Sequence, residues 1–492
     1  MKAQLVNNTT VEIEFDNEKQ REILAKQLSY KIPGYQHTVA YKTGKWKEGT
    51  KCYLTAKNRL KIGLFKSLFP NHSLVFDKTF TPITFEDIPL YQTNPSFERR
   101  NYQLNAINTI LQNKIMIVKA TMGAGKTLIS AATLSYHLSL TKSNKALFIT
   151  YDKNILTQTV KNFTKYGFKV SQFGDGVKDL SGDVVVSTIQ SLNNILKPKE
   201  VLKNVSFVIL DEVHHGKSKT SRKIISKIPN ADYFIGLTAT PHEKRDIDNA
   251  DLTSIVGPVL FEYGFTEATK DERIAPVKAF FLDLPTDYDL KEEIFGRKNY
   301  KLIWDKGVQE NTGRNETIAK ILSYCIELLD TPNLVLVDRI EHGLELCNAM
   351  KKEPAVKYMT MYGADDIVMR DAKKKALMTE NINTLISTVI SEGIDFAISP
   401  VFAINASGRK SFIKLIQFLG RITRPNEKFK SFRCYVDIID RTHPFLLYHS
   451  NERIKTCEEF GIEVEICKSV KELLVEIIKY YKQCTKEKNE PQ

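Results

Sequence analysis

Cysteine is scarce in this sequence, with seven residues among 492. The cysteines form no CxxC pair, and no cluster of cysteine and histidine has the spacing of metal ligands. A disulfide framework needs paired cysteines, and a structural zinc site needs closely spaced cysteine and histidine ligands. The sequence therefore argues against both, and it favours a reducing compartment.

Long apolar runs are missing as well. No stretch approaches the roughly 18 apolar residues of a membrane-spanning helix. The opening segment, MKAQLVNNTTVEIEF, carries charges where a signal peptide would need its apolar stretch. We therefore expect a soluble, cytoplasmic protein without a membrane partner.

Acidic residues are fewer than basic ones. The chain has 58 Asp and Glu against 71 Lys and Arg, a formal net charge of +13, which predicts a polyanionic partner. Much of the excess lies in residues 31–66, which hold nine basic residues and one acidic residue. Tyr35, Tyr41, Trp46 and Tyr53 are interleaved with them. This short segment is thus the strongest candidate for nucleic-acid contact.

The length suffices for roughly three domains at about 150 residues each. Short alternating segments separated by turn signals predict a small α+β module over residues 1–90. Beyond it, short apolar strands alternate with helical stretches in two successive series, and this pattern predicts parallel sheets with helices on both faces. The expected fold class is α/β, with parallel-sheet domains at residues 91–280 and 281–450 and a helical tail at residues 451–492.

A phosphate-binding loop is predicted at residues 120–127, ATMGAGKT, between an apolar strand and a helical stretch. Small residues let backbone N–H groups surround phosphate oxygens, a lysine reaches the β- and γ-phosphates, and a hydroxyl reaches Mg²⁺. Ala120 stands where the usual first glycine of such loops would be. The alternative is a glycine-rich turn that merely opens a helix. The candidate nucleotide ligands are Thr121, Gly123, Gly125, Lys126 and Thr127, with Thr127 also a candidate magnesium ligand.

A pair of carboxylates follows a second apolar strand about 85 residues later. Asp211 and Glu212 begin the segment DEVHH at the end of the strand at residues 207–210. Parallel sheets bind ligands at the carboxyl ends of their strands, so Asp211 is placed to hold Mg²⁺ and Glu212 to orient or deprotonate the attacking water. The alternative is a solvated strand end with surface histidines.

An AxxGxGKT loop followed by DEVH resembles the superfamily 2 helicases and translocases, and further motifs of that superfamily follow in order over residues 91–445. The resemblance implies two RecA-like domains that use ATP and Mg²⁺. In the first domain, RNYQ, ITYDKNILTQ, VSTIQS and TATP resemble the adenine-reading, strand-gripping and coupling motifs. These matches imply adenine contacts from Arg100 and Gln103, strand contacts from Lys153 and Thr188, and coupling roles for His214, Thr238 and Thr240.

The second domain carries the remaining motifs: LVLVDRIEH, TVISEGID and QFLGRITR of this chain resemble motifs IV, V and VI of the superfamily. A far domain can complete an ATP site with cationic side chains, as arginine fingers do. Arg421 and Arg424 suit that role if they lie at i and i+3 on one helix face. Without the other motifs, the same two arginines would indicate only an ordinary basic helix face. The resemblance implies strand contacts from Arg339 and Thr388, nucleotide contacts from Gly393 and Asp395, a coupling role for Gln417, and catalytic cations at Arg421 and Arg424.

The substrate is expected to be DNA, because DEVH and TATP differ from the DEAD and SAT forms of RNA-unwinding relatives. The segment at residues 257–276 and the basic N-terminal module are most similar to phage UvsW-type branch-migration helicases. The resemblance implies an ATP-dependent helicase for branched, forked or duplex DNA, in bacterial or phage-infected cytoplasm, and the sequence leaves open whether it is a monomer. Two alternatives remain: the motor subunit of a restriction complex, and an RNA-remodelling or RNA-sensing DExH ATPase.

In the N-terminal module, Lys42, Lys45 and Lys47 are expected to contact phosphates without sequence preference. The aromatic rings between them either stack on bases or form the core of their own hairpin. The sequence leaves both interpretations open.

Overall fold

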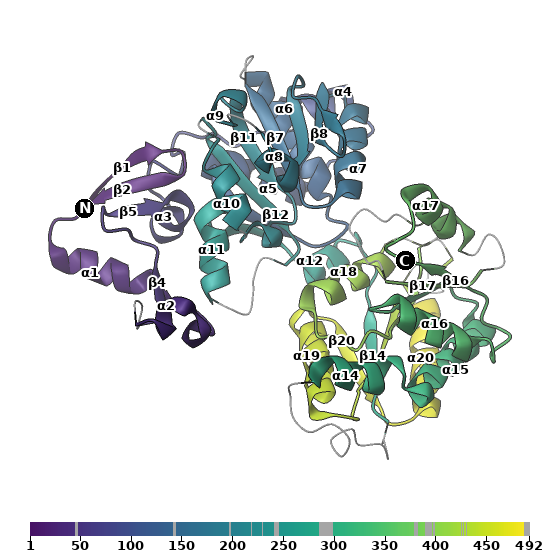
Figure 1. Cartoon of the computed structure of the whole chain (residues 1–492). Helices are drawn as coiled ribbons and strands as arrows, with labels where there is room; N and C mark the ends of the chain where they lie inside the picture. The colour runs from purple at the N-terminus through teal and green to yellow at the C-terminus, as the bar shows by residue number, and fades with distance from the viewer. Residues whose placement is uncertain are drawn as a thin grey trace. The chain divides into compact units, whose positions relative to one another are not determined.

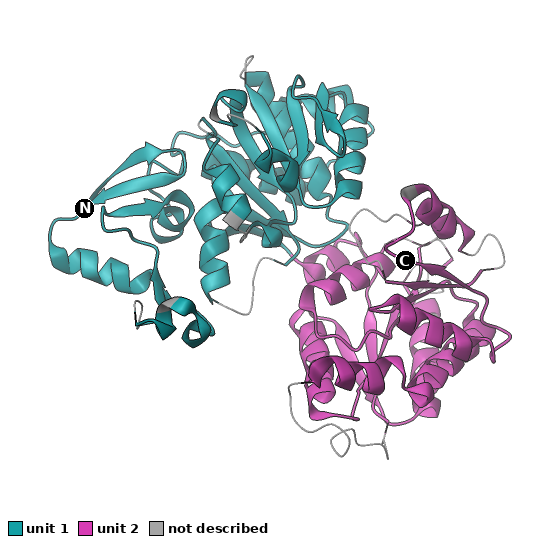
Figure 2. Cartoon of the chain, in the orientation of Figure 1, with its two compact units in different colours: residues 1–263 teal, residues 264–492 magenta. Residues whose placement is uncertain are grey.

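The computed structural model contains two compact units, Met1–Tyr263 and Gly264–Gln492 (Figure 2). No helix in the part of the chain that it describes is long and apolar enough to cross a membrane. All seven cysteines are free thiols, and six of them are buried. The described residues are 1–44, 48–140, 144–195, 198–217, 219–228, 230–240, 246–284, 299–377, 382–388, 396, 399–424, 426, 428–429 and 431–486.

Unit 1 begins with a small antiparallel sheet and its helices. Its strands are β1 (Lys2–Asn7), β2 (Thr10–Glu14) and β5 (Arg59–Lys61), and its helices are α1 (Glu18–Gln27) and α3 (Ile62–Leu68). Val11 and Ile13 alternate with more exposed polar residues along β2 and are fully buried with Leu60. Between α1 and β5 lie β3 (Ser29–Lys31), η1 (Tyr35–His37), α2 (Val39–Lys42) and β4 (Thr50–Cys52).

This module is packed against helix α11 (Asp246–Val256) of the same unit. A Cβ at Gly63 of α3 would lie 2.0 Å from the carbonyl oxygen of Thr253, so only glycine permits this close approach. Asp251 of α11 accepts hydrogen bonds from Lys51 (2.5 Å) and from the Tyr53 hydroxyl (2.6 Å). The basic module is therefore fixed to the larger part of unit 1 by both close packing and polar contacts.

The large sheet of unit 1 has eight strands in the order β13-β6-β12-β11-β7-β10-β8-β9. Every pairing is parallel except that of β8 with the terminal β9. Helices lie on both faces of the sheet (Figure 1). The strands are β6 (Ile115–Ala120), β7 (Lys145–Thr150), β8 (Val170–Gly174), β9 (Val177–Lys178), β10 (Val184–Thr188), β11 (Val205–Leu210), β12 (Tyr233–Thr238) and β13 (Val259–Tyr263). The helices are η2 (Phe85–Asp87), α4 (Pro89–Thr93), α5 (Asn101–Asn113), α6 (Lys126–Leu140), α7 (Lys153–Lys165), α8 (Ile189–Asn193), α9 (Pro198–Val201), η3 (Val213–Lys217) and α10 (Lys219–Ile225).

Unit 2 contains a second, wholly parallel sheet in the order β16-β17-β15-β18-β19-β14-β20. Two such α/β units confirm the predicted pair of RecA-like domains. The strands are β14 (Lys278–Leu282), β15 (Asn333–Leu336), β16 (Tyr358–Met361), β17 (Thr384–Ser387), β18 (Phe402–Asn405), β19 (Cys434–Ile438) and β20 (Glu463–Cys467). The helices are α12 (Phe265–Lys270), α14 (Tyr300–Trp304), the π-helical turn η5 (Asp305–Gln309), α15 (Thr312–Leu329), α16 (Ile340–Met350), α17 (Ile367–Ala376), α18 (Phe412–Ile422), α19 (Pro444–Glu459) and α20 (Val470–Lys486).

The unit boundary differs from the expected division at residues 280 and 281. Strand β14 hydrogen-bonds to β19 and β20 and so belongs to the sheet of unit 2. Its sequence, KAFFL, is buried from Ala279 to Leu282 and would suit a central strand of either sheet. The expected helical tail at residues 451–492 also differs, because it contributes the edge strand β20 to the same sheet.

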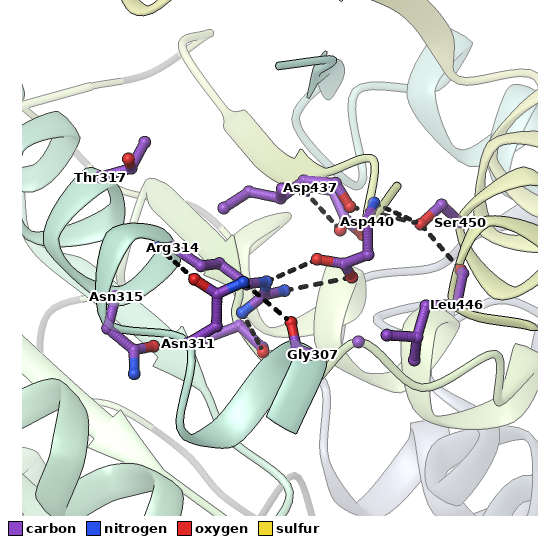
Figure 3. A network of polar contacts seen from close by, with 12 residues as sticks. Gly307, Asn311, Arg314, Asn315, Thr317, Asp437, Asp440, Leu446 and Ser450 are labelled. Carbon is purple, nitrogen blue, oxygen red and sulfur yellow. Dashed lines mark hydrogen bonds and ion pairs between the residues drawn. The ribbon is translucent and has the colours of Figure 1, made fainter. Parts of the chain in front are cut away.

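Buried ion pairs connect the helices of unit 2 to the end of β19 (Figure 3). Arg314 of α15 donates to Asp440 at 2.6 Å, and the backbone N–H of Asp440 donates to the Ser450 hydroxyl of α19 at 3.0 Å. Arg453 of α19 donates to both carboxylate oxygens of Asp437, at 2.8 and 2.9 Å. Removal of one partner would leave a buried charge uncompensated, so these pairs fix the positions of α15 and α19 against the sheet.

Candidate nucleotide site and strand-contact residues

The predicted phosphate loop connects β6 to α6 at the carboxyl edge of the unit 1 sheet. Gly123 and Gly125 have φ of 80° and 77°, the left-handed conformation that glycine adopts without steric cost. The ammonium group of Lys126 donates to the carbonyl oxygen of Ala120 at 3.1 Å, and Thr127 lies in the first turn of α6. Strand, loop and helix are therefore arranged as a phosphate site requires.

The predicted base-reading side chain lies against this loop. Gln103 of α5 is fully buried, and its Nε2 donates to the carbonyl oxygen of Ala124 at 3.2 Å. Its Oε1 has no hydrogen-bond partner among the residues that the structure describes. Arg100 donates to Glu98 at 2.7 Å and to the Tyr102 hydroxyl at 3.3 Å. A buried amide with an unused acceptor beside a phosphate loop fits the recognition of an adenine amino group.

Tyr102 is a residue of this site that the motif comparison missed. Its hydroxyl donates to the carbonyl oxygen of Ala124 at 3.0 Å, and its ring stacks on that of Tyr263 with centroids 3.8 Å apart and planes 5° apart. Tyr102 lies inside the RNYQ segment, so its place in the site could have been predicted from the sequence. Nothing in the sequence indicates that Tyr263, 161 residues away, lies against it.

The carboxylate pair follows β11, which is separated from β6 by β12 alone. Burial and the nearby charge of Glu212 raise the pKa of Asp211 to about 7, although Lys126 opposes this effect. Burial also acts to raise the pKa of Glu212, but the hydrogen bond from His214 and the charge of Lys126 bring it below its ordinary value. Glu212 is therefore the more readily ionised of the two carboxyl groups.

The backbone of Glu212 is unusual because its φ is 43°. A side chain other than glycine in the left-handed region costs roughly 1–2 kcal/mol, and such strain is concentrated at functional sites. Nδ1 of His214 lies 3.3 Å from a carboxylate oxygen of Glu212 and 3.2 Å from the Thr238 hydroxyl. That hydroxyl accepts from the backbone N–H of Thr240 at 3.0 Å. A chain of polar contacts thus runs from the carboxylate pair to the TATP segment.

Two predicted strand-contact residues of unit 1 begin helices at the same sheet edge. Lys153 is the first residue of α7, where its exposed ammonium group pairs with Asp175 at 2.8 Å. Thr188 caps α8: its hydroxyl accepts from the backbone N–H of Ser191 at 3.2 Å and lies 2.8 Å from the Ser191 hydroxyl. Lys153 therefore offers a charge at the surface, whereas the Thr188 hydroxyl is engaged in its helix cap.

In the N-terminal module, Lys42 is exposed on α2. Lys45, Trp46 and Lys47 lie outside the described residues. The Tyr35 and Tyr41 rings pack edge to face at 5.2 Å, and the Tyr53 ring lies beneath the ammonium group of Lys51 at 4.2 Å. These contacts favour a structural role for the tyrosines, while the exposed charge of Lys42 suits phosphate contact.

The strand-contact candidates of unit 2 are held by neighbouring side chains. The Arg339 guanidinium lies 4.8 Å from the centroid of the Trp304 ring and donates to Asp305 at 3.0 Å. The Thr388 hydroxyl accepts from the backbone N–H of Gly363 at 3.2 Å. Gly393 and Asp395 lie outside the described residues. Trp304 and Asp305 escaped the motif comparison because they lie in a polar connector, where a lone tryptophan was the only signal.

The two candidate arginine fingers do not share a helix face, contrary to expectation. Gln417 and Arg421 lie on α18, but this helix ends at Ile422, so Arg424 follows it. Arg424 precedes Pro425, and a residue before proline is disfavoured in the helical conformation. Arg421 is 5 % exposed, whereas Arg424 is half-buried.

Comparisons with known proteins find similarities to helicases and to restriction enzymes. The family described as "Type III restriction enzyme, res subunit" matches residues 96–243. The protein named "Putative helicase 22" of the Sulfolobus islandicus filamentous virus is 26 % identical over 457 residues, which cover 88 % of this chain and 79 % of the viral protein. The ATP-dependent DNA helicase uvsW of Enterobacteria phage T4 is 25 % identical over 368 residues, which cover 72 % of this chain and 70 % of the phage protein.

A solved structure supports the fold. The ATP-dependent Type ISP restriction-modification enzyme LlaBIII, bound to DNA, superposes with a TM-score of 0.56 and 15 % identity. The match covers 79 % of this chain and 32 % of that longer enzyme. Together with the ordered motifs and the two parallel-sheet units, these findings show that the chain is similar in sequence and fold to the superfamily 2 helicases and translocases, which hydrolyse ATP.

Proposed function

We propose that the chain couples ATP hydrolysis to movement along DNA and to separation of its strands, with branched, forked or duplex DNA as substrate. The convergence of the phosphate loop, the Gln103 amide and the carboxylate pair at one edge of the unit 1 sheet carries this proposal. Similarity to a phage ATP-dependent DNA helicase and the basic N-terminal module support DNA as the polymer.

In this mechanism, the nucleotide is held by unit 1. Gln103, with Arg100 beside it, reads the adenine, while Thr121, Gly123, Gly125 and Lys126 surround the phosphates. The Thr127 hydroxyl and the Asp211 carboxylate are hard oxygen donors of the kind that suits Mg²⁺. When bound, the ion would neutralise charge on the phosphates.

Glu212 is proposed to orient and deprotonate the attacking water. Its lowered pKa keeps the carboxylate ionised and able to accept a proton. His214, which contacts both Glu212 and Thr238, would pass a change at the carboxylate to the TATP segment. Glu212 thus acts on the water, and His214, Thr238 and Thr240 act in coupling.

Unit 2 is proposed to complete catalysis and to hold the strand. Arg421 and Arg424 would stabilise charge that develops during phosphoryl transfer, with Gln417, Gly393 and Asp395 in supporting roles. Strand phosphates would be bound by cationic and hydroxyl groups of both units, which open and close with the nucleotide cycle. The proposed strand contacts are Lys42, Lys45, Lys47, Lys153, Thr188, Arg339 and Thr388.

The test compares ATP hydrolysis and strand separation on DNA forks, four-way junctions, R-loops and RNA duplexes. The proposal expects DNA to stimulate hydrolysis and forked or branched DNA to be unwound by a monomer. Stimulation of ATP hydrolysis by RNA but not by DNA would overturn the proposal that DNA is the substrate.

A second candidate is the motor subunit of a restriction complex, favoured by the match to the res subunit family. Such a motor would move along duplex DNA without separating its strands. Displacement of a third strand from a triplex, without unwinding of a fork, would support this candidate and contradict the first.

A further inference from the structure

Tyr263 occupies a special place in the chain because unit 1 ends at this residue and unit 2 begins at Gly264. It is also the last residue of β13, the edge strand beside the strand that leads into the phosphate loop. In that pairing, Tyr263 lies opposite Ala120. The exit from unit 1 therefore lies directly beside the entrance to the nucleotide site.

Two separate contacts join Tyr263 to the nucleotide site. Its carbonyl oxygen accepts a hydrogen bond from the backbone N–H of Thr121, the first residue of the loop, at 2.9 Å. Tyr263 is 4 % exposed, and its ring stacks face to face on that of Tyr102. The Tyr102 hydroxyl in turn donates to Ala124 in the same loop. Tyr263 thus contacts the loop through its backbone and the base-reading segment through its ring.

The connection on the other side is short. Only Gly264 separates Tyr263 from helix α12, and the Gly264 N–H donates to the Glu267 side chain at 3.0 Å. The Gly264 carbonyl oxygen accepts from the N–H of Ala268 at 3.1 Å. Phe265 of α12 packs against the hydrophobic core of unit 2. Both backbone groups of Gly264 are hydrogen-bonded within the start of α12. A displacement of Tyr263 is therefore passed to α12 instead of being absorbed by a flexible linker.

We propose that Tyr263 is a positioning residue that transmits the nucleotide state of the phosphate loop to the start of unit 2, so that ATP hydrolysis drives strand movement. This inference rests on the proposed function. A loop that closes around phosphates must either carry the Tyr263 carbonyl with it or break the hydrogen bond to Thr121. The flat ring stack on Tyr102 opposes rotation of Tyr263 away from the loop by about 1 kcal/mol.

The competing interpretation is that the ring only fills space in the core. The two interpretations differ in what happens to the number of base pairs opened per ATP hydrolysed. Loss of packing lowers the fraction of active molecules, which reduces hydrolysis and unwinding together and leaves that ratio unchanged. Loss of transmission lowers unwinding while hydrolysis continues, so the ratio falls.

The experiment measures this ratio on forked DNA for Tyr263→Leu, Tyr263→Met and Tyr263→Phe in the full chain. Methionine fills similar space without a flat ring and serves if the leucine variant does not fold. Tyr233→Leu is the matched control, because Tyr233 also stacks on an aromatic ring, Phe207 at 4.6 Å, but at the opposite end of the unit 1 sheet.

We expect the ratio to fall about fivefold in the leucine and methionine variants, which corresponds to about 1 kcal/mol, the usual worth of an aromatic pair. The phenylalanine variant and Tyr233→Leu should keep the ratio of the unmodified chain. An unchanged ratio in Tyr263→Met, or an equal fall in Tyr233→Leu, would overturn the inference. Absence of DNA unwinding by the unmodified chain would instead overturn the proposed function.

Discussion

Substitution of Gly125 tests whether the phosphate loop and Gln103 form one nucleotide site. A Cβ at Gly125 would lie 2.5 Å from Nε2 of Gln103, closer than two such atoms can approach. Gln103 is fully buried and its Nε2 donates to Ala124, so the amide cannot move aside without losing that hydrogen bond. Gly125→Ala should therefore displace the base-reading side chain.

A matched control separates the energetic cost of a side chain in the left-handed backbone conformation from the effect of the clash with Gln103. Gly125 has φ of 77° and Gly176 has φ of 85°, but a Cβ at Gly176 would meet no atom within 4 Å. Both alanine variants should lower the free energy of unfolding by roughly 1–2 kcal/mol, the cost of a side chain in the left-handed region, and Gly125→Ala should lower it by about 1 kcal/mol more because it breaks the Gln103 hydrogen bond. Only Gly125→Ala should also weaken ATP binding, by about tenfold for one lost hydrogen bond of about 1.4 kcal/mol.

The assay is calorimetric titration of each variant with ATP and with GTP. Displacement of Gln103 predicts that Gly125→Ala loses its preference for ATP over GTP, whereas Gly176→Ala keeps the Kd values of the unmodified chain. If Gly125→Ala weakens the binding of ATP and of GTP equally, only the phosphate contacts are disturbed, and base reading by Gln103 is refuted. Unchanged ATP binding would refute the geometry of the site itself.

Further outcomes follow from the same structure. Lys126→Ala should abolish ATP turnover, because phosphate binding is lost. Glu212→Gln should bind ATP with normal affinity but hydrolyse it at least about 100-fold more slowly, and single-turnover assays would measure that rate. Lys42→Gln should weaken DNA binding and flatten its dependence on log salt concentration by about one unit, whereas the control Lys203→Gln should change neither; an unchanged slope would return Lys42 to a structural role. Hydrogen bonds from a neighbouring arginine and lysine lower the pKa of Asp283 from 3.8 to about 2, so its contribution to stability is present at neutral pH and is lost as the pH falls from about 4 to about 2. Thermal unfolding across that range should show a smaller loss of stability for Asp283→Asn than for the unmodified chain.

The nucleotide site was accessible from the sequence because its geometry follows from local rules. Glycines before a lysine, at the end of an apolar strand, predict a phosphate loop. Asp211 follows a second strand, and the carboxyl ends of parallel strands meet at one edge. The phosphate loop and Asp211 could both be predicted without the strand order, because every order of a parallel sheet leaves the ends of their two strands at the same edge.

Other features required the tertiary structure. The strand at residues 278–282 is equally apolar in either sheet, so the boundary could not be located from its pattern. Arg424 was expected on a helix because i and i+3 spacing suggests one, but the proline that follows ends the helix early. The contact of Tyr263 with Tyr102 depends on the pairing of β13 with β6, which no local pattern reveals.

ATP-driven strand separation is tested most directly by the rates of strand separation and of ATP hydrolysis on forked DNA, measured for the unmodified chain and for Glu212→Gln. We expect strand separation that requires ATP and increases with the ATP consumed, and separation at least about 100-fold slower by the Glu212→Gln variant, although it still binds ATP and DNA. Hydrolysis that no DNA stimulates, or strand separation that persists undiminished in Glu212→Gln, would contradict this expectation.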